Sequence, residues 1–193
     1  GYLGKAILKR DAEGALRAYL TRVFLADPRR VRTFKHRAES LWLNWAAMLQ
    51  VAPKPSNFRS VLTYLVDHPN AYRKALNLIP QRLLSLYLAA YQSYLWNRIV
   101  ATYLDQFYAG PRCSQAPQSA GVRSLSIAGQ SLPIHTELPS HAADLLSATR
   151  IALPHHRAQF RPSTVARIAE NALGEEDLSL VDLKARILTR AYM

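Results

Sequence analysis

The stretch "PQRLLSLYLAAYQSYLWNRIVATYLDQFY", residues 80–108, decides the fold, because no glycine or further proline interrupts it. Pro80 suits the first turn of a helix, where a missing N–H costs nothing, and "AGP" at 109–111 ends the helical pattern. Leucine, tyrosine, tryptophan and isoleucine occupy most of the circumference. A helix that is apolar on most sides is buried, so the sequence predicts one long buried helix over residues 80–108.

Polar side chains on this helix fall into two groups. With an advance of about 100° per residue, Gln92, Ser93 and Asn97 share one sector. A second, charged sector is expected to face solvent and contains Arg98, Thr102 and Asp105. The uncharged sector must either bond neighbouring backbone groups or line a cleft, because buried polar groups need partners. Helical periodicity leaves both interpretations open.

Apolar residues at helical spacing predict further helices before this one, at 12–23, 28–52, 56–66 and 71–79. Asp11, Asp27 and Ser56 are placed to cap the first three of them. The prolines at 53 and 55 would end the second helix.

The chain after the long helix changes character. Residues 109–123 are rich in Ser, Gln, Pro and Gly, which predicts a loop or linker. "RSLSIAGQSLPI", residues 123–134, alternates polar and apolar side chains around a glycine, as two short paired strands do. Short helices are expected at 140–152 and 161–173, and residues 180–193 are expected to form a helix that passes into a strand.

These elements predict an α+β fold that is predominantly helical, with a small β-hairpin and a C-terminal strand. The expected parts are a helical segment at 1–108, a loop at 109–123 and a small α/β part at 124–193. A strand at the end of the chain needs a neighbour to pair with. The sequence therefore indicates a fragment of a larger fold.

Basic residues outnumber acidic ones by 25 to 13, so the formal net charge is +12. A field of this sign attracts polyanions, with nucleic acid the commonest partner and an anionic membrane surface the next. "DPRRVRTFKHR", residues 27–37, either contacts phosphate or forms an ordinary solvated helix face. Further arginines cluster in residues 154–161 and 186–190.

The sequence contains no recognisable catalytic motif. It has no Gly-rich phosphate loop, no HExxH or GxSxG motif and no paired acids at helical spacing. The single cysteine, Cys113, allows no disulfide within the chain, so a reducing, cytoplasmic setting is expected. We expect no membrane partner, because no uncharged apolar stretch of roughly 18 residues occurs. A monomer is expected.

Taken with the preceding "RKALNLIPQRLLSLY", the segment "LAAYQSYLWNRIVATYL" resembles the third sequence motif of the TruD family of tRNA pseudouridine synthases. That motif is a helix in which a basic residue and several aliphatics precede a Y-Q-S-Y-x-x-N core, matched here by Arg82, Tyr91, Gln92, Ser93, Tyr94 and Asn97. The resemblance covers nearly the whole chain and is strongest from 72 to 104. It implies isomerisation of uridine to pseudouridine in tRNA or another structured RNA, without cofactor or metal.

The resemblance also implies roles for individual residues. The wall of the active-site cleft would contain Tyr91, Gln92, Ser93 and Asn97. RNA would be bound by Arg82, Arg157, Arg161, Arg186 and Arg190. The nucleophilic aspartate of the family lies in a Lys-Asp motif that this sequence lacks, so we expect no catalytic residue in the chain, only the insertion domain and the motif-three helix of a larger synthase. The alternative is a catalytically inactive, basic helical module that binds RNA.

Overall fold

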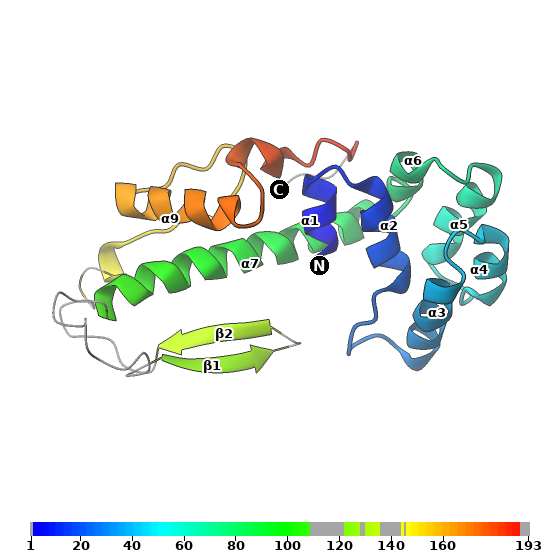
Figure 1. Ribbon diagram of the computed structural model, residues 1–193, viewed down its shortest axis with the longest axis horizontal. Coiled ribbons are helices and arrows are strands. Elements are labelled where there is room, and N and C mark those ends of the chain that lie inside the picture. The colour runs from blue at the N-terminus through cyan, green and yellow to red at the C-terminus, as the bar shows by residue number, and fades with distance from the viewer. Residues whose placement is uncertain (1, 109–121, 128–129, 136–143, 145, 190–193) are drawn as a thin grey trace. The chain divides into compact units, whose positions relative to one another are not determined.

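The computed structural model describes residues 2–108, 122–127, 130–135, 144 and 146–189. The chain divides into two compact units, the first made of Gly1–Tyr91 with Val181–Met193 and the second of Gln92–Leu180. Helix α7, Gln81–Tyr108, contributes residues to both units (Figure 1). The long helix predicted from Pro80 onward is therefore confirmed.

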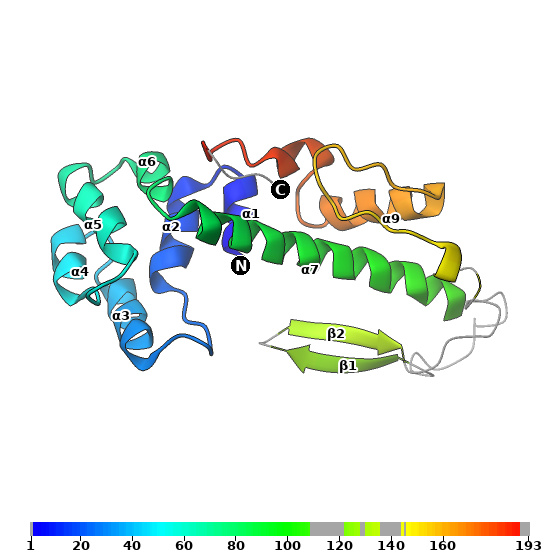
Figure 2. The same cartoon turned by 180° about the vertical axis from the view of Figure 1, so that it is seen from behind.

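Short helices build the first unit around a core of leucine, isoleucine and aromatic side chains. They are α1 (Leu3–Leu8), α2 (Ala12–Thr21), α3 (Arg29–Ser40), α4 (Trp45–Val51), α5 (Phe58–Asp67) and α6 (Tyr72–Leu76). Both ribbon views show α3, α4, α5 and α6 gathered together (Figures 1 and 2). Phe58 of α5 links α2 and α3, because its ring lies 5.1 Å from that of Tyr19 and 4.9 Å from that of Phe34.

Two of the predicted caps are wrong and one is confirmed. Asp11 accepts a hydrogen bond from the Gly14 backbone N–H at 2.8 Å and caps α2 as expected. Asp27 instead accepts bonds from the Phe24 backbone N–H and the Lys35 ammonium, both at 2.8 Å. The Ser56 hydroxyl is buried, has no hydrogen-bond partner among the described residues and does not cap α5.

The single helix expected over residues 28–52 is broken into α3 and α4. Leu43 adopts a left-handed backbone conformation with φ of 74°, which a continuous right-handed helix excludes. Asn44 then starts α4, since its side chain accepts from the Ala47 backbone N–H at 3.1 Å. A capping residue inside an apolar pattern thus ends one helix and begins the next.

The predicted C-terminal strand is absent from the described residues, so the expected α+β class is wrong. Residues Leu180–Lys184 form a 3-10 helix, η1, and Ala185 has a φ of 49°. After Ala185, backbone groups form hydrogen bonds with a side chain of the first unit. The Asn77 amide donates to the Ile187 carbonyl at 3.1 Å and accepts from the Thr189 N–H at 2.8 Å. Because an amide side chain takes these bonds, the segment does not need a neighbouring strand.

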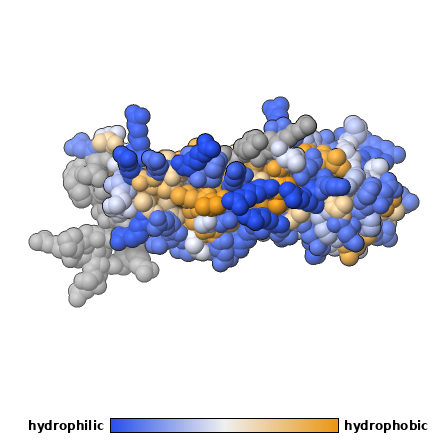
Figure 3. Space-filling model, turned by 90° about the horizontal axis from the view of Figure 1, so that it is seen from above, coloured by the Kyte–Doolittle hydropathy of each residue, from blue (hydrophilic) through white to orange (hydrophobic). Residues whose placement is uncertain are grey.

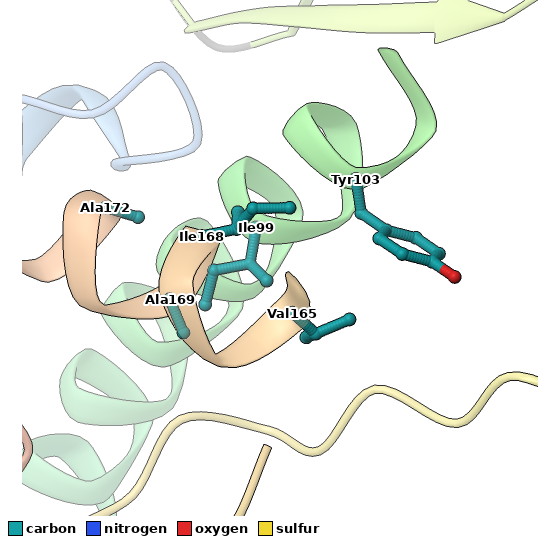
Figure 4. Packing of buried hydrophobic residues seen from close by; sticks show 6 residues of the cluster. All are labelled: Ile99, Tyr103, Val165, Ile168, Ala169 and Ala172. Carbon is teal, nitrogen blue, oxygen red and sulfur yellow. The ribbon is translucent and has the colours of Figure 1, made fainter. Parts of the chain in front are cut away.

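In the second unit, α9 (Ser163–Gly174) packs on the later turns of α7. Figure 4 shows the side chains that are buried where the two helices meet. Helix α7 contributes Ile99 and Tyr103, and α9 contributes Val165, Ile168, Ala169 and Ala172. The helix predicted at 161–173 is confirmed by α9. Strands β1 (Val122–Ile127) and β2 (Gln130–His135) form an antiparallel two-stranded ribbon with Leu125 opposite Leu132, and no other strand occurs among the described residues.

The surface mixes charged and apolar side chains. The view from above shows hydrophilic groups projecting between apolar patches (Figure 3). Large exposed apolar residues include Leu25, Leu43, Leu86 and Val181. Within the described ranges, no helix combines the length and the hydropathy that crossing a bilayer would require.

Candidate functional site

Tyr91, the first residue of the predicted cleft, is a packing residue of the first unit. Its side chain is fully buried, and its ring lies 5.4 Å from the ring of Tyr2. Helix α1 approaches so closely that a Cβ at Gly4 would lie 2.8 Å from the Tyr91 Cβ and 2.7 Å from the Tyr87 carbonyl oxygen. Only glycine allows this contact, and it fixes α1 against the first turns of α7.

The Gln92 side chain forms a hydrogen bond with a backbone carbonyl group of the second unit. Its Nε2 donates to the Pro154 carbonyl oxygen at 2.9 Å, and the indole N–H of Trp96, one turn later, donates to the Ile151 carbonyl at 3.0 Å. Together the two donors hold the non-helical segment 151–154 against α7. Of the two roles that helical periodicity left open, Gln92 therefore has the first, because its side chain bonds a neighbouring backbone group.

Ser93 and Asn97 are exposed, and they lie one helical turn apart on α7. Neither makes a hydrogen bond to any part of the chain that the structure describes. Residues at i and i+4 share a helix face, so a hydroxyl and a carboxamide are presented side by side. Both groups can donate and accept, which suits the mixed donor and acceptor edges of a nucleobase or the hydroxyls of ribose.

A charged cluster joins α7 to the end of α9. Arg98 Nη1 donates to Glu176 Oε1 at 2.9 Å, and the Tyr94 hydroxyl donates to the same oxygen at 3.1 Å. Arg98 Nη2 also pairs with Glu175. Burial, assisted by the Glu176 carboxylate, raises the pKa of Tyr94 against the opposing effect of Arg98. The phenol therefore stays neutral and acts as a hydrogen-bond donor at neutral pH.

This cluster corrects the expectation that Arg98 faces solvent with the rest of its sector. Thr102 and Asp105 are exposed, but the Arg98 side chain is only 31% exposed and is held by two acids. The available sequence signal was the spacing of Tyr94 and Arg98, four residues apart, together with "EE" directly after the α9 pattern.

The arginines predicted to bind RNA are exposed wherever they are described. Arg82 and Arg186 belong to the first unit, and Arg157 and Arg161 belong to the second. Arg190 lies outside the described residues. Within the same ranges, no group of three or more His, Cys, Asp or Glu side chains is arranged to hold a metal ion.

The chain is similar to proteins of one family. The family model for tRNA pseudouridine synthase D (TruD) matches residues 2–190. The tRNA pseudouridine synthase D of Aquifex aeolicus is 26% identical over 106 residues, which are 55% of this chain and 26% of that protein. A protein of Methanopyrus kandleri named "Probable tRNA pseudouridine synthase D" is 22% identical over 185 residues, 95% of this chain and 40% of its own length.

A crystal structure of a Methanosarcina mazei protein described under the TruD name has the same fold, with a TM-score of 0.63 and 24% identity. The similarity covers 94% of this chain and 43% of that protein. The chain thus spans less than half the length of these relatives. Because the family model matches nearly every residue, the chain belongs to the tRNA pseudouridine synthase D (TruD) family.

Proposed function

We propose that the chain acts within a full-length synthase that isomerises uridine to pseudouridine in tRNA or another structured RNA. In this proposal the second unit's part of α7 supplies one wall of the active-site cleft, and the arginine-bearing surfaces bind RNA. The protein works as a monomer in the cytoplasm. The observation that carries the proposal is the exposure of Ser93 and Asn97, because these motif residues are free to meet a substrate.

The reaction requires this wall only to orient the substrate. Isomerisation breaks the bond between nitrogen 1 of uracil and ribose carbon 1′, and forms a bond from that carbon to carbon 5 of the base. The hydrogen on carbon 5 leaves as a proton and nitrogen 1 gains one, so atoms and electrons balance. The detached base must turn without leaving the site. Hydrogen bonds from Ser93 and Asn97 would position the base or its ribose during this turn.

The cleft assignment differs among the four residues proposed for it. Ser93 and Asn97 would contact the substrate directly. Gln92 would act through the segment 151–154 that it holds, as a positioning residue. Tyr91 would support the wall from within the core, since its side chain is fully buried.

RNA binding would use the exposed arginines in sequence-independent contacts with phosphates. Arg82, near the start of α7, and Arg186 would serve from the first unit, and Arg157 and Arg161 from the second. Arg190 completes the proposed set. Guanidinium groups suit this role because they bind phosphate oxygens in pairs.

The test measures tritium release from tRNA whose uridines carry tritium at carbon 5, with the full-length protein in excess. Release of tritium to water, with pseudouridine in the digested product, is the expected result. Tight RNA binding without release would overturn the proposal in favour of an inactive RNA-binding module.

A further inference from the structure

Helix α3 borders an open hollow of about 610 Å³ that lies wholly within the first unit. Its lining includes Arg29, Arg30, Arg37 and Phe34 of α3, together with Val51 from the end of α4. The volume falls within the range of roughly 300–1,000 Å³ in which proteins commonly hold small ligands. We refer to this feature as the α3 hollow.

The positive charge of the α3 hollow is uncompensated. Arg29, Arg30 and Arg37 are exposed, and none forms an ion pair or a side-chain hydrogen bond with the described residues. Among the residues that the structure describes, no carboxylate lines the hollow. The nearest acids in sequence have other partners, because Asp27 binds Lys35 and Glu39 binds Arg17. Three like charges around one concavity raise the local concentration of anions.

The apolar residues that line the hollow indicate which kind of anion it could bind. Val51 is half-buried and offers a ligand some apolar surface, whereas Phe34 is only 1% exposed and offers almost none. A ligand suited to this lining carries several anionic groups and has only a small apolar part to pack. A phosphodiester backbone fits this description, since its phosphates accept paired hydrogen bonds from guanidinium groups and its riboses need little apolar surface.

We infer that the α3 hollow binds the phosphodiester backbone of RNA, with Arg29, Arg30 and Arg37 contacting its phosphates. This inference rests on the proposed function for the identity of the polyanion. It assigns binding to residues outside the arginine set discussed above. On this inference the two interpretations of residues 27–37 apply to different side chains. Arg29, Arg30 and Arg37 contact phosphate, whereas Arg32 and His36, which do not line the hollow, are ordinary solvated side chains.

The same helix provides the control. Arg32 is exposed on α3 but does not line the hollow, so Arg32→Gln removes the same charge from the wrong face. The variants are Arg30→Gln, Arg37→Gln and the double variant, all made in the full-length protein. These side chains are exposed, and melting followed by circular dichroism checks that every variant folds as the unmodified protein does.

The measurement is the Kd for an unmodified tRNA transcript at a series of salt concentrations. Each pocket arginine replaced should lower the slope of log Kd against log salt by about 0.7 to 0.9, because one phosphate contact is lost. Arg32→Gln should leave the slope unchanged. Equal slopes for the double variant and Arg32→Gln would overturn the assignment. Displacement of the tRNA by poly-glutamate as effectively as by RNA of equal charge would overturn it as well.

The outcome is separable from that of the proposed function. Tritium release by the unmodified protein, with no effect of the pocket variants on binding, refutes the α3 hollow and leaves the synthase function standing. A selective loss of tRNA binding in the pocket variants, from a protein that releases no tritium, supports the hollow and refutes the synthase function.

Discussion

The Gln92 side chain donates to the Pro154 carbonyl oxygen at 2.9 Å, across 62 residues of sequence. This bond distinguishes Gln92 from Ser93 and Asn97, the other two residues of the uncharged polar sector of α7. Gln92 bonds the segment 151–154, whereas Ser93 and Asn97 are exposed and make no hydrogen bond to the described residues. The division lets stability and activity be tested with different substitutions on one helix.

Gln92→Ala should lower the free energy of unfolding by about 1 kcal/mol, because the Pro154 carbonyl loses its donor in a half-buried site. Asn97→Ala should change it by less than about 0.5 kcal/mol, since that side chain is exposed and makes no hydrogen bond to the described part of the chain. Urea unfolding of both variants provides the comparison. Equal losses from the two substitutions would contradict the division of the sector.

Two adjacent acids at the end of α9, Glu175 and Glu176, should differ in their contribution to stability. The side chain of Glu176 is 12% exposed and accepts from both Arg98 and Tyr94, whereas that of Glu175 is 63% exposed. Glu176→Gln should therefore cost about 1–3 kcal/mol, and Glu175→Gln less than about 1 kcal/mol. Hydrogen exchange of the α9 amides measures the local opening directly. Faster exchange in Glu175→Gln than in Glu176→Gln would refute this ranking.

The ion pair of Asp27 with Lys35 is buried, with side-chain exposures of 17% and 4%. Asp27→Asn leaves the ammonium without its counter-charge and should destabilise the protein by about 3 kcal/mol.

The exposed pair of Arg17 with Glu39 is the control for this substitution. Glu39→Gln should cost at most about 1 kcal/mol, because both side chains are more than half exposed. Hydrogen bonds from Arg17 and Thr21 lower the pKa of Glu39, so this small contribution is present above the usual carboxyl pKa and is lost as the pH falls through the lowered one. Melting temperatures at neutral and acidic pH test both parts. A larger loss from Glu39→Gln than from Asp27→Asn is the contrary result.

Gly4→Ala should destabilise the first unit by about 1–3 kcal/mol, since the new methyl group would meet the Tyr87 carbonyl oxygen at 2.7 Å. Gly174→Ala, at the end of α9, should be neutral because no atom lies within 4 Å of the added carbon. Urea midpoints of the two variants are compared. If Gly4→Ala unfolded at the same midpoint as Gly174→Ala, the close approach of α1 to α7 would be wrong.

Much of the helical fold could be predicted from local signals. Pro80 and the uninterrupted apolar pattern after it define α7, and Asp11 marks the start of α2. Such signals act within a few residues of sequence. The break at Leu43 could not be predicted this way, because a left-handed residue inside an apolar pattern depends on how the flanking helices pack.

The errors concern contacts between distant residues. The segment after η1 is held by Asn77, 110 residues before Ile187, so its alternating pattern resembled a strand without forming one. Arg98 was expected in solvent because its acidic partners lie 77 and 78 residues later. Periodicity places Gln92, Ser93 and Asn97 in one sector, but it does not indicate which of them another segment covers.

The central claim is that the exposed pair Ser93 and Asn97 faces the RNA substrate. Its most direct test is the single-turnover rate of tritium release by full-length Asn97→Ala, with Thr102→Ala as an exposed control on another face of α7. We predict that Asn97→Ala lowers this rate at least about tenfold while its melting temperature stays that of the unmodified protein, because only a bond to substrate is lost. A rate equal to that of Thr102→Ala would contradict the claim.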